Sequence, residues 1–318
     1  MENSFDLIVI GAGPGGYVCS IKAAQLGIKT ACVESRATLG GTCLNVGCIP
    51  SKSLLHASEM YHKAKTEFSG LGIESDTIKL NLSKMMNNKN KSVSTLTKGV
   101  EFLFKKNNIT HLKGRGVVSS KNTVVVTDDS GKKVKYTAKN IVISVGSIPT
   151  SLPGIEIDEK TIVSSTGALS FDKSPKNLVV IGGGYIGLEL SSVWKRLGSN
   201  VTVIEFLDHI IPGMDRDISS EFLKILIKQE INFKLDSKVI GVKSSKGKTI
   251  VEFLNNKNKK KEKIECDKVL VAVGRKSNIG KDILDLGIKT NGQKKIEVNA
   301  KFETSVKNIY AIGDVINK

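Results

Sequence analysis

Two stretches of the sequence share one pattern and decide the fold. Residues 5–34 read FDLIVIGAGPGGYVCSIKAAQLGIKTACVE, and residues 177–205 read NLVVIGGGYIGLELSSVWKRLGSNVTVIE. Each contains a short apolar run, a group of glycines, a stretch with helical spacing, and a β-branched run that ends in Glu. This order predicts a buried strand, a helix and a second, parallel strand. Two such units predict an α/β protein with two doubly wound domains.

The glycines of the first unit occupy the G-x-G-x-x-G positions of a dinucleotide-binding turn. Gly11 allows the tight turn, Gly13 lets the backbone approach a pyrophosphate, and Gly16 lets the helix pack closely on the strand. Glu34 follows about twenty residues later, where a carboxylate can accept hydrogen bonds from a ribose diol. The alternative is a glycine turn in another kind of α/β protein. The strand, the helix and the acid around these glycines favour the dinucleotide.

The second unit repeats the pattern with Gly182, Gly184 and Gly187, and Glu205 ends its second strand. A carboxylate at this position repels a 2′-phosphate, and the next residues, FLDHIIPG, contain no Arg or Lys to bind one. This unit therefore favours NAD(H) over NADP(H). Two dinucleotide sites in one chain predict two cofactors, a flavin and a nicotinamide, that exchange a hydride.

Two of the five cysteines, Cys43 and Cys48, lie in the stretch GGTCLNVGCIPSK at residues 40–52. The four histidines form no metal-ligand spacing with them, which argues against a zinc site. Pro50 suits the first turn of a helix, so we expect Cys48 at a helix N-terminus, where the helix dipole lowers the pKa of a thiol. A thiolate-forming pair in a reducing compartment is more often redox-active than structural.

The other segments give secondary-structure predictions only. Residues 84–108 predict a helix that packs through a stripe of Val93, Leu96, Val100 and Leu103. Runs of β-prone residues at 117–126, 141–145, 238–254 and 268–273 predict strands, and residues 218–230 predict a helix.

The composition excludes several classes of function. The 318 residues carry a net charge of +17, but only five of the 48 basic residues are Arg, which disfavours base readout in nucleic acid. The densest basic run, KNKKKEK at residues 257–263, predicts a solvated loop between strands. No apolar run reaches the ~18 residues of a membrane span, and the N-terminus reads as neither a signal nor a transit peptide. We therefore expect a cytoplasmic protein that binds neither nucleic acid nor membrane.

The string GGTCLNVGCIPSK, the two glycine turns and the closing NIYAIGDV together resemble the pyridine nucleotide–disulfide oxidoreductases, and within them the dihydrolipoamide dehydrogenase branch. The resemblance covers the whole chain. It implies two Rossmann-like domains of the three-layer ββα type that bind FAD and NAD, with the second inserted into the first. The expected limits are 1–149 for the first part of the FAD domain, 150–275 for the NAD domain, and 276–318 for the return to the FAD domain.

The resemblance also implies a role for each site residue. Cys43 would exchange with the substrate sulfur, and Cys48 would lie beside the flavin ring. Lys52 would lie near flavin N5 and form an ion pair with Glu189. The stretch at residues 144–147, SVGS, resembles the A-T-G-S of the family, with Val in place of Thr. The expected cofactor contacts are Gly11, Gly13, Gly16, Glu34, Thr42, Lys52, Gly116, Gly146 and Asp314 for FAD, and Gly182, Gly184, Gly187, Glu205, Val239 and Gly274 for NAD.

The implied reaction passes electrons from dihydrolipoamide through a Cys43–Cys48 disulfide and FAD to NAD⁺, with no metal. The implied partner is the lipoyl domain of a 2-oxo acid dehydrogenase or glycine cleavage complex. Full-length members form homodimers in which a further domain supplies a His–Glu base. No His follows His209, so we expect a truncated chain without this base, at a cost of about 10²–10⁴ in rate. Two alternatives stay open: another disulfide or mercuric reductase of the family, and an FAD- and NAD-binding module that does not turn over a disulfide.

Overall fold

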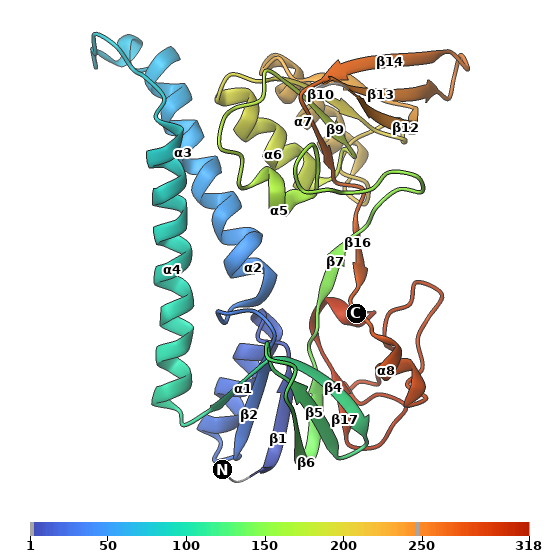
Figure 1. Cartoon of the computed structure of the whole chain (residues 1–318). Helices are drawn as coiled ribbons and strands as arrows, with labels where there is room; N and C mark the ends of the chain where they lie inside the picture. Colours follow the sequence, from blue (N-terminus) through green and yellow to red (C-terminus); the bar gives the residue numbers. More distant parts are fainter. Residues whose placement is uncertain (1–2, 246–247, 318) are drawn as a thin grey trace. The chain divides into compact units, whose positions relative to one another are not determined.

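The computed structural model describes residues 3–245 and 248–317. The chain divides into two compact units (Figure 1). Unit 1 comprises Met1–Asn45, Val93–Ile148 and Arg275–Lys318, and unit 2 comprises Val46–Ser92 and Pro149–Gly274. The second unit is inserted into the first, as predicted. Residues 46–92 nevertheless group with unit 2, whereas the predicted first domain included them.

A mixed sheet forms the centre of unit 1, with strand order β3-β2-β1-β6-β5-β4 and β17 paired with β6. Its parallel strands are β3 (Thr110–Lys113), β2 (Thr30–Glu34), β1 (Ser4–Ile10), β6 (Lys133–Ile143) and β17 (Ile309–Ala311). The antiparallel strands β4 (Arg115–Ser120) and β5 (Thr123–Thr127) form a meander with the start of β6. The helix α1 (Pro14–Gln25) connects β1 to β2 and packs on both strands.

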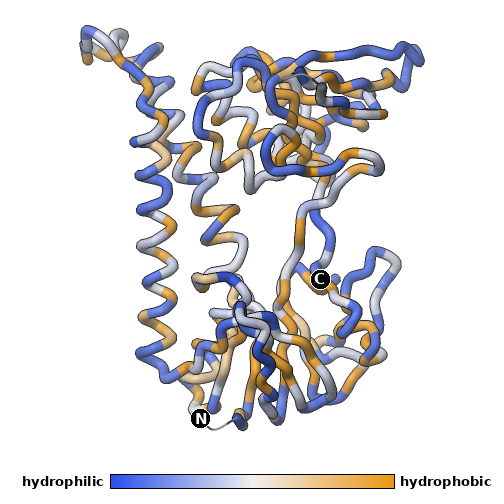
Figure 2. The backbone as a smooth tube through the Cα atoms, viewed as in Figure 1, coloured by the Kyte–Doolittle hydropathy of each residue, from blue (hydrophilic) through white to orange (hydrophobic). Residues whose placement is uncertain are grey.

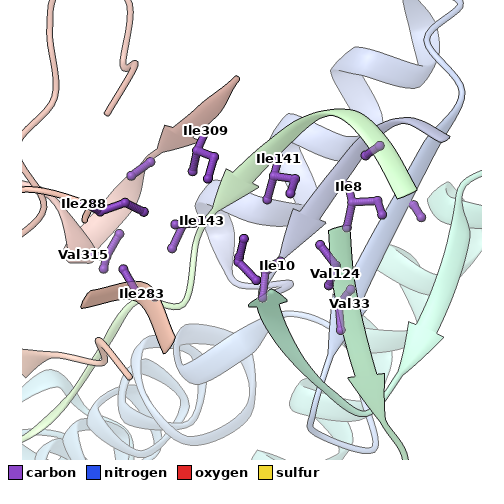
Figure 3. Close-up of a cluster of buried hydrophobic side chains, with 14 of the residues drawn as sticks. Ile8, Ile10, Val33, Val124, Ile141, Ile143, Ile283, Ile288, Ile309 and Val315 are labelled. Carbon is purple, nitrogen blue, oxygen red and sulfur yellow. The ribbon is translucent and has the colours of Figure 1, made fainter. Parts of the chain in front are cut away.

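The main core of unit 1 lies between the parallel strands and the meander (Figure 3). Ile8 and Val33 project from the parallel strands toward Val124 of the meander, and Ile141 extends the cluster toward Ile309. Alternate residues of a strand point to opposite faces of the sheet, so the other face of β1 and β2 is left for α1. Helix, parallel strands and meander are the three layers of the predicted ββα arrangement.

Unit 2 has the same three layers. Its parallel sheet has the order β11-β10-β9-β15-β8, and a separate antiparallel meander has the order β12-β13-β14. On β9, Val179 and Ile181 face the meander core, and Leu178 and Val180 face the helical core that contains the fully buried Trp194. The strands and the longer helices are β8 (Ile162–Val163), β9 (Asn177–Ile181), β10 (Asn200–Ile204), β11 (Asn232–Lys234), β12 (Ser237–Ser245), β13 (Lys248–Asn255), β14 (Lys261–Cys266), β15 (Lys268–Val271), α6 (Tyr185–Arg196) and α7 (Arg216–Lys228).

The basic run at residues 257–263, predicted as a loop, is a loop only in its first four residues. Residues 257–260 are the exposed turn after β13, but residues 261–263 begin β14, a strand that the sequence did not predict. Ion pairs on this meander explain how a strand tolerates so many lysines, because Glu252 lies between Lys243 at 3.9 Å and Lys263 at 2.8 Å.

The remaining elements connect these layers. They are α2 (Gly41–Val46), α3 (Cys48–Thr66), η1 (Ser69–Leu71), α4 (Leu82–Lys106), β7 (Ser147–Pro149), α5 (Ser165–Ala168), β16 (Arg275–Ser277), α8 (Lys281–Asp285) and η2 (Gly313–Val315). The helix α4 carries both hydrophilic and hydrophobic residues along its length (Figure 2). None of the helices within residues 3–245 and 248–317 combines the length and the apolar character that crossing a membrane requires.

Candidate active site

Four predicted segments meet at one edge of the unit 1 sheet. The strands β1, β2, β6 and β17 are parallel, so their carboxyl ends lie at the same edge. Gly11 follows β1, Glu34 ends β2, Gly146 follows β6, and Asp314 follows β17. In open α/β sheets, ligands bind outside this edge.

The three fingerprint glycines of unit 1 serve different purposes. Gly11 has a φ of +98°, and a Cβ added there would overlap the carbonyl oxygen of Ser144. A Cβ at Gly16 would overlap the carbonyl oxygen of Gly11, so the protein itself requires both glycines. At Gly13 the nearest atom to an added Cβ is the Cα of Gly41, 3.9 Å away. Gly13 therefore leaves space at the start of α1 rather than relieving a clash.

The start of α1 fits a phosphate. No side chain caps the helix, and its first turn contains no acidic residue. The first N–H groups and the positive end of the helix dipole therefore face the space that Gly13 leaves.

Glu34 is held against this turn. Its carboxylate is buried and accepts hydrogen bonds from the backbone N–H groups of Ala12 (2.9 Å to Oε2) and Arg36 (2.9 Å to Oε1). An ionised carboxylate has about four acceptor positions, so Glu34 retains capacity for a ribose hydroxyl.

Unit 2 repeats the arrangement. Glu205 is buried and accepts from the N–H groups of Gly183 (2.6 Å to Oε2) and Leu207 (2.9 Å to Oε1). An added Cβ would overlap backbone at Gly182 and Gly187 but would meet nothing within 4 Å at Gly184. No side chain caps α6. The two units thus present two similar glycine turns, each beside an uncapped helix start and a buried carboxylate.

The predicted glycine at the end of β15 and the predicted valine on β12 lie in unit 2 as well. Gly274 follows β15 at the same edge and has a φ of +113°. Val239 lies next to a β-bulge on β12 and packs, partly buried, on the meander core. Their contacts with NAD stay predictions.

Two further glycines predicted to contact FAD lie in unit 1. At Gly116 on β4, an added Cβ would lie 3.0 Å from Val33 Cγ1 and 3.2 Å from Ile10 Cγ2, so the absence of a side chain lets the meander approach the sheet. Gly146 has a φ of +66°, and its carbonyl oxygen accepts from the N–H of Asn278 (2.9 Å). The cofactor contacts of both residues stay predictions.

The cysteine motif begins directly on the first glycine turn. The N–H of Gly40 donates to the carbonyl oxygen of Ala12 (2.9 Å), and a Cβ added at Gly41 would overlap the Cα of Gly13. Thr42 and Cys43 follow within α2. Because Gly40 and Gly41 have no side chains, the start of α2, the helix that contains Cys43, packs directly on the glycine turn after β1.

Cys43 and Cys48 are disulfide-bonded, whereas Cys19, Cys32 and Cys266 are free. Cys48 is the first residue of α3, as predicted, and its side chain is exposed. Burial raises the pKa of Cys32 and of Cys266 to about 12, so neither forms a reactive thiolate near neutral pH. Burial also raises the pKa of the half-buried Cys19, which leaves the disulfide as the best-supported redox centre among the described cysteines.

The predicted ion pair between Lys52 and Glu189 is present. Lys52 Nζ on α3 lies 2.6 Å from Glu189 Oε1 on α6. Ser51, which the sequence did not single out, donates to Glu189 Oε2 at 2.8 Å. The Lys52 side chain is 61% exposed, so its ammonium can also contact a ligand.

A family profile for pyridine nucleotide-disulphide oxidoreductases matches residues 5–318. The chain belongs to this family. Among curated relatives, the mitochondrial dihydrolipoyl dehydrogenase of Bos taurus is 52% identical over 317 residues, and that of Pisum sativum is 50% identical over 312 residues. Each alignment covers 98% of this chain and 62% of the relative. The chain therefore spans about three fifths of the length of these oxidoreductases.

A solved structure of the same class also matches. It is the Cu(II) complex of the HOCl-induced flavoprotein disulfide reductase RclA from Escherichia coli, with 26% identity and a TM-score of 0.85. The match covers 98% of this chain and 66% of that chain. Within the described part of this chain, no group of three or more His, Cys, Asp and Glu residues is arranged to hold a metal ion.

Proposed function

We propose that unit 1 binds FAD. The uncapped start of α1, the space at Gly13 and the buried carboxylate of Glu34 support this proposal. The pyrophosphate would meet the N–H groups of the helix, and Glu34 would accept from the adenosine ribose. Asp314, at the same edge of the sheet, would lie at the ribityl or pyrophosphate region and accept a hydrogen bond from a ribityl hydroxyl.

Unit 2 would bind NAD in the same manner, at Gly184, the start of α6 and Glu205. The buried carboxylate of Glu205 would accept from the ribose hydroxyls and repel a 2′-phosphate, which supports NAD over NADP. When bound, FAD and NAD supply hydride transfer, and the chain supplies the dithiol chemistry.

The chain would act as the dihydrolipoyl dehydrogenase type of oxidoreductase. A thiolate of dihydrolipoamide attacks Cys43 Sγ, the Cys43–Cys48 bond breaks, and Cys48 leaves as a thiolate. The second substrate thiol loses its proton to water and attacks the substrate sulfur of the mixed disulfide, so that lipoamide leaves as a cyclic disulfide and Cys43 receives the electron pair as a thiolate. Two electrons then reside on the cysteine pair. The position of Cys48 at the N-terminus of the 19-residue helix α3 favours its thiolate.

The disulfide substrate would be carried by the lipoyl domain of a 2-oxo acid dehydrogenase or glycine cleavage complex. The full-length protein would form a homodimer. The protein would be cytoplasmic, whereas the relatives from Bos taurus and Pisum sativum are named as mitochondrial proteins.

The observation that carries this function is the Cys43–Cys48 disulfide, which joins α3 to the helix α2 that starts against the first glycine turn. The test is to purify the chain with FAD, reduce it with dithionite, and reoxidise it briefly in air. We expect a long-wavelength absorption from Cys48 thiolate next to the oxidised flavin, and we expect Cys48→Ser to abolish it. Cys266→Ser, which removes a buried free thiol, is the control. Failure to bind FAD, or the same band in Cys48→Ser, would overturn the proposal.

The match with the flavoprotein disulfide reductase RclA supports a second candidate, another disulfide or mercuric reductase of the family, in which electrons would run from the nicotinamide outward. Full-length protein assayed with NADH and NADPH against lipoamide, glutathione disulfide and Hg²⁺ separates the two. Preference for lipoamide and NADH supports the first proposal.

A further inference from the structure

A three-residue hydrogen-bond chain ends on Asp314. Arg275 Nε donates to Ser147 Oγ (2.8 Å), and Ser147 Oγ lies 2.7 Å from Asp314 Oδ2. A second guanidinium nitrogen of Arg275, Nη2, donates to the carbonyl oxygen of Ser147. All three residues belong to unit 1.

The chemistry of the three groups fixes the direction of this chain. A guanidinium can only donate, so Arg275 occupies a lone pair of the Ser147 hydroxyl oxygen. The hydroxyl has a single proton, which must then point to the carboxylate of Asp314. The permanent positive charge of Arg275 polarises this hydroxyl and strengthens its bond to the carboxylate.

The backbone holds Ser147 and Arg275 side by side. Ser147 is the first residue of β7 and Arg275 is the first residue of β16, and these two strands pair in a two-stranded sheet. The N–H of Asn278 donates to the carbonyl oxygen of Gly146 (2.9 Å), which fastens the segment that follows β16 to the one before β7. The pair is therefore placed by main-chain pairing and does not depend on Asp314.

Asp314, by contrast, lies in the short helical turn η2 and is exposed. Within residues 3–245 and 248–317, the Asp314 carboxylate accepts a hydrogen bond from one group, the Ser147 hydroxyl. An exposed carboxylate without such a partner samples several rotamers. With Oδ2 held by Ser147, Oδ1 is left in a defined direction to accept from a ligand hydroxyl.

We propose that Ser147 and Arg275 are positioning residues that orient Asp314 for FAD. This inference rests on the proposed FAD site. It assigns a task to the last residue of the SVGS stretch and to the arginine after Gly274, neither of which was predicted to act on the cofactor.

The test measures FAD affinity by titrating FAD into the FAD-free chain and following flavin fluorescence. We expect Ser147→Ala and Arg275→Lys each to weaken binding about tenfold, because a hydrogen bond to a charged group is lost or misdirected. Ser147→Thr keeps the hydroxyl and should stay within about twofold of the parent. Ser119→Ala is the matched control, since it removes a hydroxyl of unit 1 that bonds the carbonyl oxygen of Thr123 instead.

A double-mutant cycle separates positioning from a general structural effect. If Ser147 acts through Asp314, Ser147→Ala should weaken binding no further in an Asp314→Asn background. Full weakening in that background, or parent affinity for Ser147→Ala alone, would overturn the inference. Arg275→Lys breaks the same chain independently, so the inference stays testable if Ser147→Ala does not fold. If the parent chain binds no FAD, the proposed function is overturned as well. If the parent binds FAD and Ser147→Ala binds it equally well, only this inference is overturned.

Discussion

Lys52 and Glu189 are joined by an ion pair of 2.6 Å, although 137 residues separate them in the sequence. Ser51 holds the second carboxylate oxygen of Glu189. The carboxylate is therefore fixed from α3 by two neighbouring residues, and the ammonium of Lys52 is fixed in return. A side chain held in this manner can stabilise negative charge on a bound flavin without reorganising.

Replacing Lys52 should slow electron transfer without emptying the flavin site. We expect Lys52→Met to reduce the rate of flavin reduction by NADH about tenfold or more, since one positive group near developing charge is lost. Stopped-flow absorbance of FAD-loaded protein measures this rate. Lys63→Met is the matched control, because Lys63 lies on the same helix and pairs with Glu59 at 2.8 Å. A parent rate in Lys52→Met would contradict the assigned role.

Substitutions at two glycines of the second turn, Gly182 and Gly184, should affect protein stability and NADH binding differently. Gly182→Ala places a Cβ into the carbonyl oxygen of Ala272 at a φ of +109°, so we expect a loss of about 2 kcal/mol or more in unfolding free energy. Gly184→Ala meets nothing within 4 Å and should leave that free energy nearly unchanged while weakening NADH binding. Urea unfolding and NADH titration of both variants give the comparison. Normal NADH affinity in Gly184→Ala would argue against a pyrophosphate at this turn.

Glu205 should govern the choice between NADH and NADPH. We expect Glu205→Ala to reduce the preference for NADH about tenfold or more, because the ribose loses an acceptor and a 2′-phosphate loses a repelling charge. The ratio of the two dissociation constants, measured by titration, is the readout. Glu34→Ala removes the equivalent carboxylate of unit 1 and should lower FAD affinity while leaving this ratio unchanged. An unchanged ratio in Glu205→Ala would refute the assignment.

His111 should make the fold sensitive to acid. Burial lowers the pKa of His111 below its usual 6.5, and the positive charge of Lys113 lowers it further. As the pH falls below 6.5, the unfolded chain binds the proton first, so stability falls until the pH reaches the lower folded pKa. The slope is at most about 1.4 kcal/mol per pH unit for one group. Above pH 6.5 both states are neutral and this contribution is constant.

The measurement is urea unfolding of the parent and of His111→Leu at pH 7.5 and pH 5.5. We expect the parent to lose more stability than the variant between these values. Equal losses would show that His111 does not contribute to the acid sensitivity.

Local pattern predicted the two nucleotide units well. The runs before Gly11 and Gly182 are strands β1 and β9, and Pro50 lies in the first turn of α3 as expected. These predictions succeed because a buried parallel strand, a glycine turn and a helix start each depend on residues close together in the chain.

The predicted apolar stripe of the 84–108 helix was partly wrong. Val100 is buried, but Leu96 is 44% exposed and Leu103 is 38% exposed, whereas Phe104 is 2% exposed and packs edge-on against His111. Helical spacing alone predicted that all four apolar residues would be buried to a similar extent. The exposure of each residue depends on distant segments that pack on the helix, such as His111 of β3 against Phe104.

The sequence by itself determined that this chain has two dinucleotide turns, a paired-cysteine motif between them, and an acid at the end of each second strand. Only the tertiary structure decided that Gly41 rests on Gly13, that Ser51 joins Lys52 on Glu189, and that Arg275 reaches Asp314 through Ser147. The physical reason is that a turn or a helix start is specified by adjacent residues. A hydrogen bond between distant residues exists only once parallel register and close packing have brought their segments to the same edge.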